Sequence, residues 1–150
     1  MIRKFKEEDT TRVMALWTKG NFEAHDFIDK DYWLLNYNEV KEKYLKNAET
    51  YVYVKDNEII GFISLLDDGY IGALFVCRKF QRQGIGHLLL DYAISVLGTS
   101  NPVITVSDEH IQEFSSILLG DYNFSLTELQ AGYYRKDHTE YVFNGSLIQQ

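Results

Sequence analysis

Three successive β-type segments constrain the fold of this chain more than any other feature. Thr50 to Lys55 and Glu58 to Leu66 are rich in β-branched and aromatic residues, and only Asp56-Asn57 separates them. Such a short connection is typical of an antiparallel hairpin. A second turn, Asp67-Asp68-Gly69, leads into a third segment, Tyr70 to Val76, so we expect a three-stranded meander.

A helix start containing two glycines follows the meander. Apolar residues at helical spacing predict a helix over Gly84 to Leu97, with Gly98 past its end. Pro102 to Val106 is then a short strand reached by a right-handed crossover, which should place it parallel to the strand ending at Val76. The remaining elements expected are a strand Met1 to Phe5, a helix from Glu7 to about Gly20, an amphipathic helix Asp31 to Lys46, a helix Glu109 to Leu119, and strands Phe124 to Gln130 and Thr139 to Phe143.

Composition narrows the class of protein. The length of 150 residues suits one domain, and 45% hydrophobic with 25% charged residues is typical of a globular protein. No segment has the apolar length of a membrane span and the N-terminal residues lack the pattern of a signal peptide, so we expect a single cytoplasmic domain over residues 1–150 without membrane association. Cys77 is the only cysteine, and the ligand spacings of a zinc site are missing, so no metal is expected. A net charge of -7 argues against a general nucleic-acid binder.

The segment between the third strand and the helix has the composition of an anion site. Arg78, Lys79 and Arg82 carry positive charge, and no acidic residue lies between positions 78 and 87. The first turn of a helix presents unpaired N–H groups, and Gly84 and Gly86 let a phosphate approach the backbone. Glycines at a helix start are also common for turn geometry alone. The residues by themselves therefore do not decide between an anion site and a structural turn. A dinucleotide fold is not indicated, because its fingerprint needs an N-terminal βαβ unit, and the chain has no Gly-Lys-Ser/Thr of a triphosphate loop.

The same segment resembles the signature of the GNAT superfamily of N-acetyltransferases. Gln81, Gly84 and Gly86 match its pattern Gln/Arg-x-x-Gly-x-Gly/Ala, and the segments 61–76 and 88–93 around it are similar as well. The order of expected elements is that of the family over nearly all of the chain, and the region from Trp17 to Tyr32 resembles small bacterial members. The resemblance implies an α+β fold with a mixed, mostly antiparallel sheet of about seven strands, about four flanking helices, and a V-shaped split between strands 4 and 5.

The family also implies a co-substrate, acetyl-coenzyme A. Its pantetheine arm would lie along the strand end near Phe75 and Val76, and a free backbone N–H near Val76 would stabilise the developing oxyanion. Its diphosphate would meet the helix start. The residues implied to bind it are Phe75, Val76, Gln81, Arg82, Gln83, Gly84, Ile85, Gly86 and His87.

The resemblance further implies acetyl transfer to a primary amine of a small molecule or peptide by direct attack in a ternary complex. An ammonium has no lone pair, so a base or water chain must remove a proton. The loop His25-Asp26-Phe27 would cap the acceptor side, with His25 as the candidate base. For Asp108, Glu109 and His110, just past a cleft-lining strand, a solvated surface role is favoured.

One departure from the family concerns the general acid. When Asn123-Phe124 is aligned with the family's Gly-Phe, Gln112 takes the usual Asn position and Leu118-Leu119 the usual Phe-Tyr pair. Tyr122 is the remaining candidate acid, although a packing role is favoured for it. Two alternatives therefore stay open, a non-catalytic acyl-coenzyme A binding or sensing module and an interaction module that has lost the site. The acceptor amine and the choice between monomer and homodimer are left undetermined.

Overall fold

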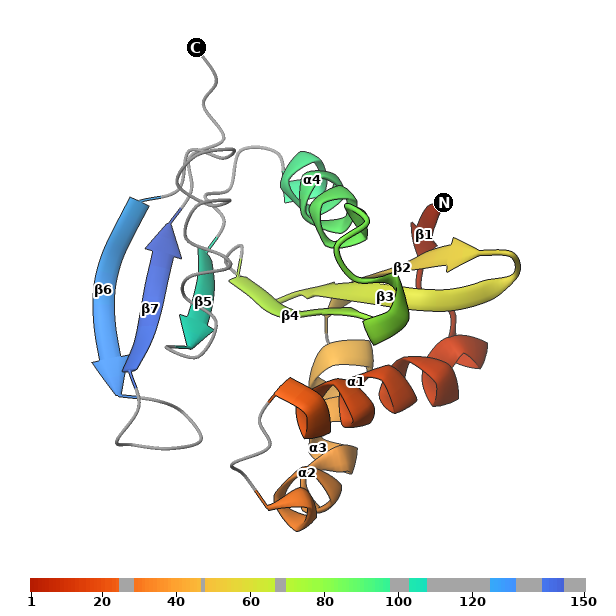
Figure 1. The fold of residues 1–150 in the computed structure, drawn as a ribbon, viewed down its shortest axis with the longest axis horizontal. Coiled ribbons are helices and arrows are strands. Elements are labelled where there is room, and N and C mark those ends of the chain that lie inside the picture. Colours follow the sequence, from red (N-terminus) through yellow and green to blue (C-terminus); the bar gives the residue numbers. More distant parts are fainter. Residues whose placement is uncertain are drawn as a thin grey trace. The chain divides into compact units, whose positions relative to one another are not determined.

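The computed structural model describes residues 1–24, 29–46, 48–66, 70–97, 103–107, 125–131 and 139–144 (Figure 1). The chain divides into two compact units, Met1–Asp67 with Gly72–Val96 and Asp68–Ile71 with Leu97–Gln150. No helix in these ranges is long and apolar enough to cross a membrane.

The sheet of the first unit carries the predicted meander. β1 pairs with β2, and β2 with β3, in antiparallel fashion. Asp56 and Asn57 connect β2 and β3 with φ of 52° and 64°, the positive values that a tight hairpin turn requires. The predicted hairpin is confirmed. In their order across the sheet, the strands are β1 (Ile2–Lys4), β2 (Glu49–Lys55), β3 (Glu58–Leu65) and β4 (Tyr70–Val76). The first two residues of β4 belong to the second unit.

A β-bulge interrupts the hairpin at Ile60. Tyr53 lies opposite Gly61, but the next residue, Val54, lies opposite Ile59, so Ile60 is the extra residue on β3. An extra residue shifts the in-and-out alternation of side chains, and Ile59 accordingly joins the same core cluster as Phe62. The Ile60 carbonyl accepts a hydrogen bond of 2.7 Å from the N–H of Cys77, just past β4. The bulge thereby ties the end of β4 to the middle of the sheet.

The first helix is longer than the sequence predicts. A 3-10 turn η1 (Glu7–Asp9) leads into α1 (Thr10–Ala24), which passes through Gly20 without ending. The prediction that Gly20 marks the end of the helix is wrong. A Cβ at Gly20 would lie 2.5 Å from Cδ1 of Phe75, so the glycine makes room for that ring. A packing requirement between distant residues explains the glycine, and no local rule could reveal it.

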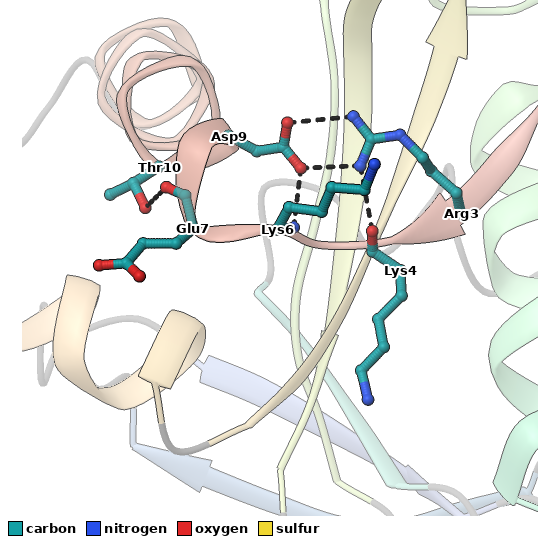
Figure 2. A network of polar contacts seen from close by, with 6 residues as sticks. All are labelled: Arg3, Lys4, Lys6, Glu7, Asp9 and Thr10. Atoms are coloured by element: carbon teal, nitrogen blue, oxygen red, sulfur yellow. Dashed lines mark hydrogen bonds and ion pairs between the residues drawn. The ribbon is translucent and has the colours of Figure 1, made fainter.

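An ion pair fixes the start of this helix (Figure 2). The carboxylate of Asp9 accepts hydrogen bonds of 2.8 and 3.0 Å from the guanidinium of Arg3 and one of 2.8 Å from the N–H of Lys6. The hydrogen bonds from Arg3 are the main reason why the pKa of the buried Asp9 is lowered. β1 and η1 are joined by this pair.

Residues 30–46 are helical but not one continuous helix. Asn36 ends the first segment, because its Nδ2 donates to the Tyr32 carbonyl at 2.7 Å and its backbone leaves the helical region, at φ −96° and ψ 2°. Trp33 still faces the core, so the predicted amphipathic pattern holds although its continuity does not. The segments are α2 (Lys30–Leu35), α3 (Tyr37–Lys41) and the π-helix η2 (Glu42–Lys46).

Helices cover both faces of the first unit's sheet. α1 lies on one face and α4 (Ile85–Leu97) on the other, as Figure 1 shows. On the α4 side, Leu89 packs so close to Gly61 that a Cβ there would lie 3.3 Å from its Cδ1. On the α1 side, the rings of Phe62 and Phe75 stack with centroids 5.5 Å apart. The core of this face consists of Val13, Met14, Leu16, Trp17, Trp33, Leu45, Val52, Ile59, Phe62 and Ala73.

The second unit begins with the first two residues of β4. Tyr70 and Ile71 pair in parallel with Val103 and Ile104 of β5 (Val103–Ser107), which confirms the predicted parallel pairing after the helix. β5 pairs antiparallel with β7 (Thr139–Asn144), and β7 antiparallel with β6 (Ser125–Ala131). The protein therefore has an α+β fold with a mixed, mostly antiparallel sheet. The helix predicted over 109–119 lies outside the described residues, and the split between strands 4 and 5 stays a prediction.

Candidate functional site

The segment that joins β4 to α4 is held by its own hydrogen bonds at the strand end. The side-chain amide of Gln81 donates to the Val76 carbonyl at 2.9 Å, and the backbone N–H of Gln81 donates to the Arg78 carbonyl at 3.2 Å. The 3-10 turn η4 (Arg78–Phe80) lies between Val76 and Gln81 in the chain. The signature glutamine thus shapes the loop by closing it back onto β4.

Beyond Gln81 the backbone alternates in handedness. Arg82 and Gly84 have φ of 64° and 85°, whereas Gln83 between them is not left-handed. Left-handed residues of this kind also occur in the concave backbone arrangements that bind anions. In the first turn of α4, the N–H of Leu88 donates to the Gly84 carbonyl at 3.0 Å.

The backbone N–H groups of residues 82–86 lie before the first turn of the helix or at its start. Among the hydrogen bonds that join described residues, none uses the backbone N–H of residues 82–86. A helix start carries partial positive charge on such groups. The loop therefore presents several donors to any anion that approaches from solvent.

The two signature glycines have different surroundings. A Cβ at Gly84 would meet no heavy atom within 4 Å, so the space beside this residue is open, although its positive φ disfavours any side chain. A Cβ at Gly86 would lie 3.8 Å from Cγ2 of Val76, an ordinary contact. Between them Ile85 is 5% exposed and anchors the helix start in the core. Only its backbone remains available to a ligand.

The charge on this loop is positive and partly comes from another strand. Arg78, Lys79 and Arg82 are exposed, as the sequence predicts for a basic loop. Lys55, at the end of β2, places its Nζ 5.2 Å from the ring centroid of Phe80, and Nζ of Lys79 lies 5.3 Å from the same centroid. Lys55 was missed in the sequence because its partners are distant along the chain.

The strand end differs in part from what the sequence suggests. The side chain of Phe75 stacks on Phe62 and fills the space beside Gly20, so Phe75 can offer only backbone groups to a ligand. The carbonyl of Val76 already accepts from Gln81. The N–H of Cys77, the first amide past Val76, donates to the Ile60 carbonyl and is not free. The expected free N–H near Val76 stays a prediction.

The remaining predicted site residues divide into described and undescribed ones. His87, in the first turn of α4, has its Nδ1 3.6 Å from Oδ2 of Asp91, one turn further along. His25, Asp26 and Phe27 lie outside the described residues, as does Tyr122. Within the described part of the chain, no group of three His, Cys, Asp or Glu side chains is placed to hold a metal ion.

Comparison with known proteins identifies the family. The acetyltransferase (GNAT) domain model matches residues 23–114, which include the whole loop described above. The chain belongs to this family. The GNAT match covers more than half of the chain, so it does not rest on the loop alone.

Individual GNAT relatives extend the comparison. The chain is 33% identical over 92 residues to the peptidyl-lysine N-acetyltransferase YiaC of Escherichia coli, covering 61% of this chain and 63% of that protein. It is 30% identical over 96 residues to the peptidyl-lysine N-acetyltransferase YjaB of Salmonella typhimurium, covering 63% and 65%. The matched part thus spans somewhat less than two thirds of these relatives' length.

Solved structures show the same fold over nearly the whole chain. The PaiA N-acetyltransferase of Thermoplasma acidophilum, solved in complex with coenzyme A, superposes with a TM-score of 0.78 at 18% identity, covering 97% of this chain and 98% of that one. At this level of identity the likeness establishes the GNAT fold.

Proposed function

We propose that this chain is an acetyl-coenzyme A-dependent N-acetyltransferase that acetylates a primary amine by direct attack in a ternary complex. The observation that carries the proposal is the loop at residues 82–86, whose backbone N–H groups form no hydrogen bond within the described part of the chain. Such a row of donors, with Arg78, Lys79 and Arg82 around it, suits a diphosphate.

The loop fits the coenzyme by two further observations. The space beside Gly84 is open, so a phosphate can come close to the backbone there. The loop is also attached to the rest of the unit, because Gln81 donates to the Val76 carbonyl and Ile85 is buried in the core. In this proposal the coenzyme is bound through backbone groups of Phe75, Val76, Gln81, Arg82, Gln83, Gly84, Ile85 and Gly86, and by the side chains of Arg82 and His87.

Acetyl-coenzyme A would supply the acetyl group as a thioester. The chain must then orient the acceptor amine and take up its proton, since only the neutral amine is a nucleophile. We assign the acceptor side to His25, Asp26 and Phe27, with His25 as the base. Tyr122 is assigned to return a proton to the departing sulfur, a step that a thiolate leaving group can partly do without.

The relatives suggest which acceptor to test first. YiaC and YjaB are peptidyl-lysine N-acetyltransferases, so we propose a lysine side chain of a peptide or protein as the first class of acceptor. The net charge of -7 favours encounter with a cationic acceptor. Small polyamines and aminoglycosides form the second class.

Two measurements test this function separately. Calorimetry with coenzyme A should give a dissociation constant in the micromolar range, because several charge-assisted hydrogen bonds are available to the diphosphate. Release of free thiol from acetyl-coenzyme A is then followed with lysine peptides and small amines. Absence of any heat at millimolar coenzyme A contradicts the binding step, whereas tight binding without thiol release on any amine favours the acyl-coenzyme A sensor.

A further inference from the structure

Two lysines converge on one aromatic ring beside the proposed diphosphate loop. Lys55 comes from the end of β2 and Lys79 from η4, and both ammonium groups lie within about 5.3 Å of the Phe80 ring centroid. Phe80 is half-buried, and its backbone N–H is fixed by a 2.8 Å bond to the Cys77 carbonyl. The half-buried ring therefore makes two cation–π contacts, with lysines from different parts of the chain.

The surrounding charges leave this cluster positive. Glu58, the acid at the start of β3, is 3.2 Å from the guanidinium of Arg12 and is neutralised by it. Asp56, in the hairpin turn, is the remaining acidic residue close to Lys55 in sequence. Its single negative charge is outnumbered by the positive charges of Lys55, Lys79 and Arg82. Holding like charges near one ring is unfavourable, and a bound anion would offset that repulsion.

The position of this cluster indicates which anion it can take. It lies at the far end of the loop from Gly84, and it includes a residue of β2 that the diphosphate pattern does not contain. Coenzyme A carries, besides its diphosphate, one phosphate monoester at the ribose 3′ position. A dianionic monoester between two ammonium groups is a charge-assisted arrangement that a neutral ligand cannot match.

We propose that Lys55 and Lys79, positioned by the ring of Phe80, form a second anion subsite that binds the 3′-phosphate of coenzyme A. This inference rests on the proposed function, because it requires that the diphosphate occupies the neighbouring loop. The subsite makes the protein select coenzyme A over forms that lack the 3′-phosphate. Lys55 is the diagnostic residue, because Lys79 borders the diphosphate loop itself.

Calorimetry with coenzyme A and with 3′-dephospho-coenzyme A tests the subsite. We expect the wild-type protein to bind coenzyme A about tenfold more tightly than the dephospho form. In Lys55→Met, which keeps the apolar stem, that ratio should fall to about two, through weaker binding of coenzyme A alone. Phe80→Leu should lower the ratio partway, because the lysines lose their contacts with the ring.

A matched control comes from the first strand. Lys4→Met removes the charge of another exposed lysine of the same unit and should leave the ratio unchanged. Equal affinities of the wild-type protein for both ligands overturn the subsite and leave the proposed function standing. Equal weakening of both ligands in Lys55→Met also overturns it, since that is a general effect of charge. No binding of either ligand by the wild-type protein refutes the proposed function itself.

Discussion

Two helix starts in the first unit differ in how the N–H groups near them find a hydrogen-bond acceptor. At η1 the carboxylate of Asp9 accepts the N–H of Lys6 and holds Arg3, so the protein supplies its own anion (Figure 2). At α4 no carboxylate plays that part, and among described residues the N–H groups of 82–86 have no hydrogen-bonding partner. An internal carboxylate serves stability, whereas an open start is ready for an external anion.

The largest expected effect is on ligand binding at the open start. Gly84→Val places a branched side chain in the open space beside the backbone, so we expect coenzyme A affinity to fall at least about 100-fold by calorimetry. The left-handed φ of 85° adds about 1–2 kcal/mol of strain. Circular dichroism should show a folded protein. Unchanged affinity would mean that the diphosphate does not approach Gly84.

The second prediction concerns η1, the helix start whose anion is the carboxylate of Asp9. Asp9→Asn leaves Arg3 without its carboxylate and should lower the free energy of unfolding by about 2–3 kcal/mol, measured by urea denaturation. Coenzyme A affinity below the unfolding transition should stay within about threefold. Glu7→Gln is the control, because Glu7 lies two residues before Asp9 in the same 3-10 turn and Figure 2 draws no bond to its carboxylate. It should change stability little. A comparable loss in Glu7→Gln would point to overall charge as the cause.

The pH dependence of stability sharpens the same contrast. The pKa of Asp9 is lower in the folded state than in the unfolded chain, where it is about 4, chiefly because of the hydrogen bonds from Arg3. Its stabilisation is therefore complete above about pH 4 and is lost as the pH falls through the folded-state pKa. The melting temperature of Asp9→Asn should consequently fall less steeply below about pH 4 than that of the wild-type protein. Parallel curves for both proteins would remove Asp9 from the acid response.

The smallest expected effect concerns how the open start is held. Gln81→Leu removes the 2.9 Å bond to the Val76 carbonyl, and we expect coenzyme A affinity to weaken about fivefold as the loop loosens. The neighbouring Gln83→Leu is the matched control, because its amide reaches the Lys79 carbonyl only at 3.5 Å. Calorimetry should show less than about a twofold change for it. Equal effects of both substitutions would indicate a contact of the side chains with the ligand.

Features that depend on residues close together in the sequence could be predicted. The hairpin at Asp56-Asn57, the helix over Ile85–Leu97 and the basic loop before it each follow from local spacing and turn chemistry. Features that depend on distant contacts could not. Gly20 is read locally as a helix end but is dictated by the ring of Phe75, and Asn36 divides a segment whose apolar spacing is continuous.

The candidate site shows the same limit. Its backbone donors lie in one short segment and follow the family pattern, so the sequence alone singles out Gln81, Gly84 and Gly86. Their part in coenzyme binding stays a prediction. Lys55 could not be found, because only folding brings it to Phe80. The acceptor residues His25, Asp26 and Phe27 and the candidate acid Tyr122 stay predictions.

In the proposed function, the hydrogen bond from Cys77 to the bulged residue Ile60 connects the coenzyme-binding loop to the central strands. Because this bond attaches the start of the loop to β3, we expect a perturbation of β3 to change the conformation of the loop as well. A substitution that weakens the bulge, far from any ligand, should first reveal itself as poorer coenzyme retention and only later as unfolding on heating. In the proposed function, variation along β3 would therefore change coenzyme binding without altering any residue assigned to the coenzyme site.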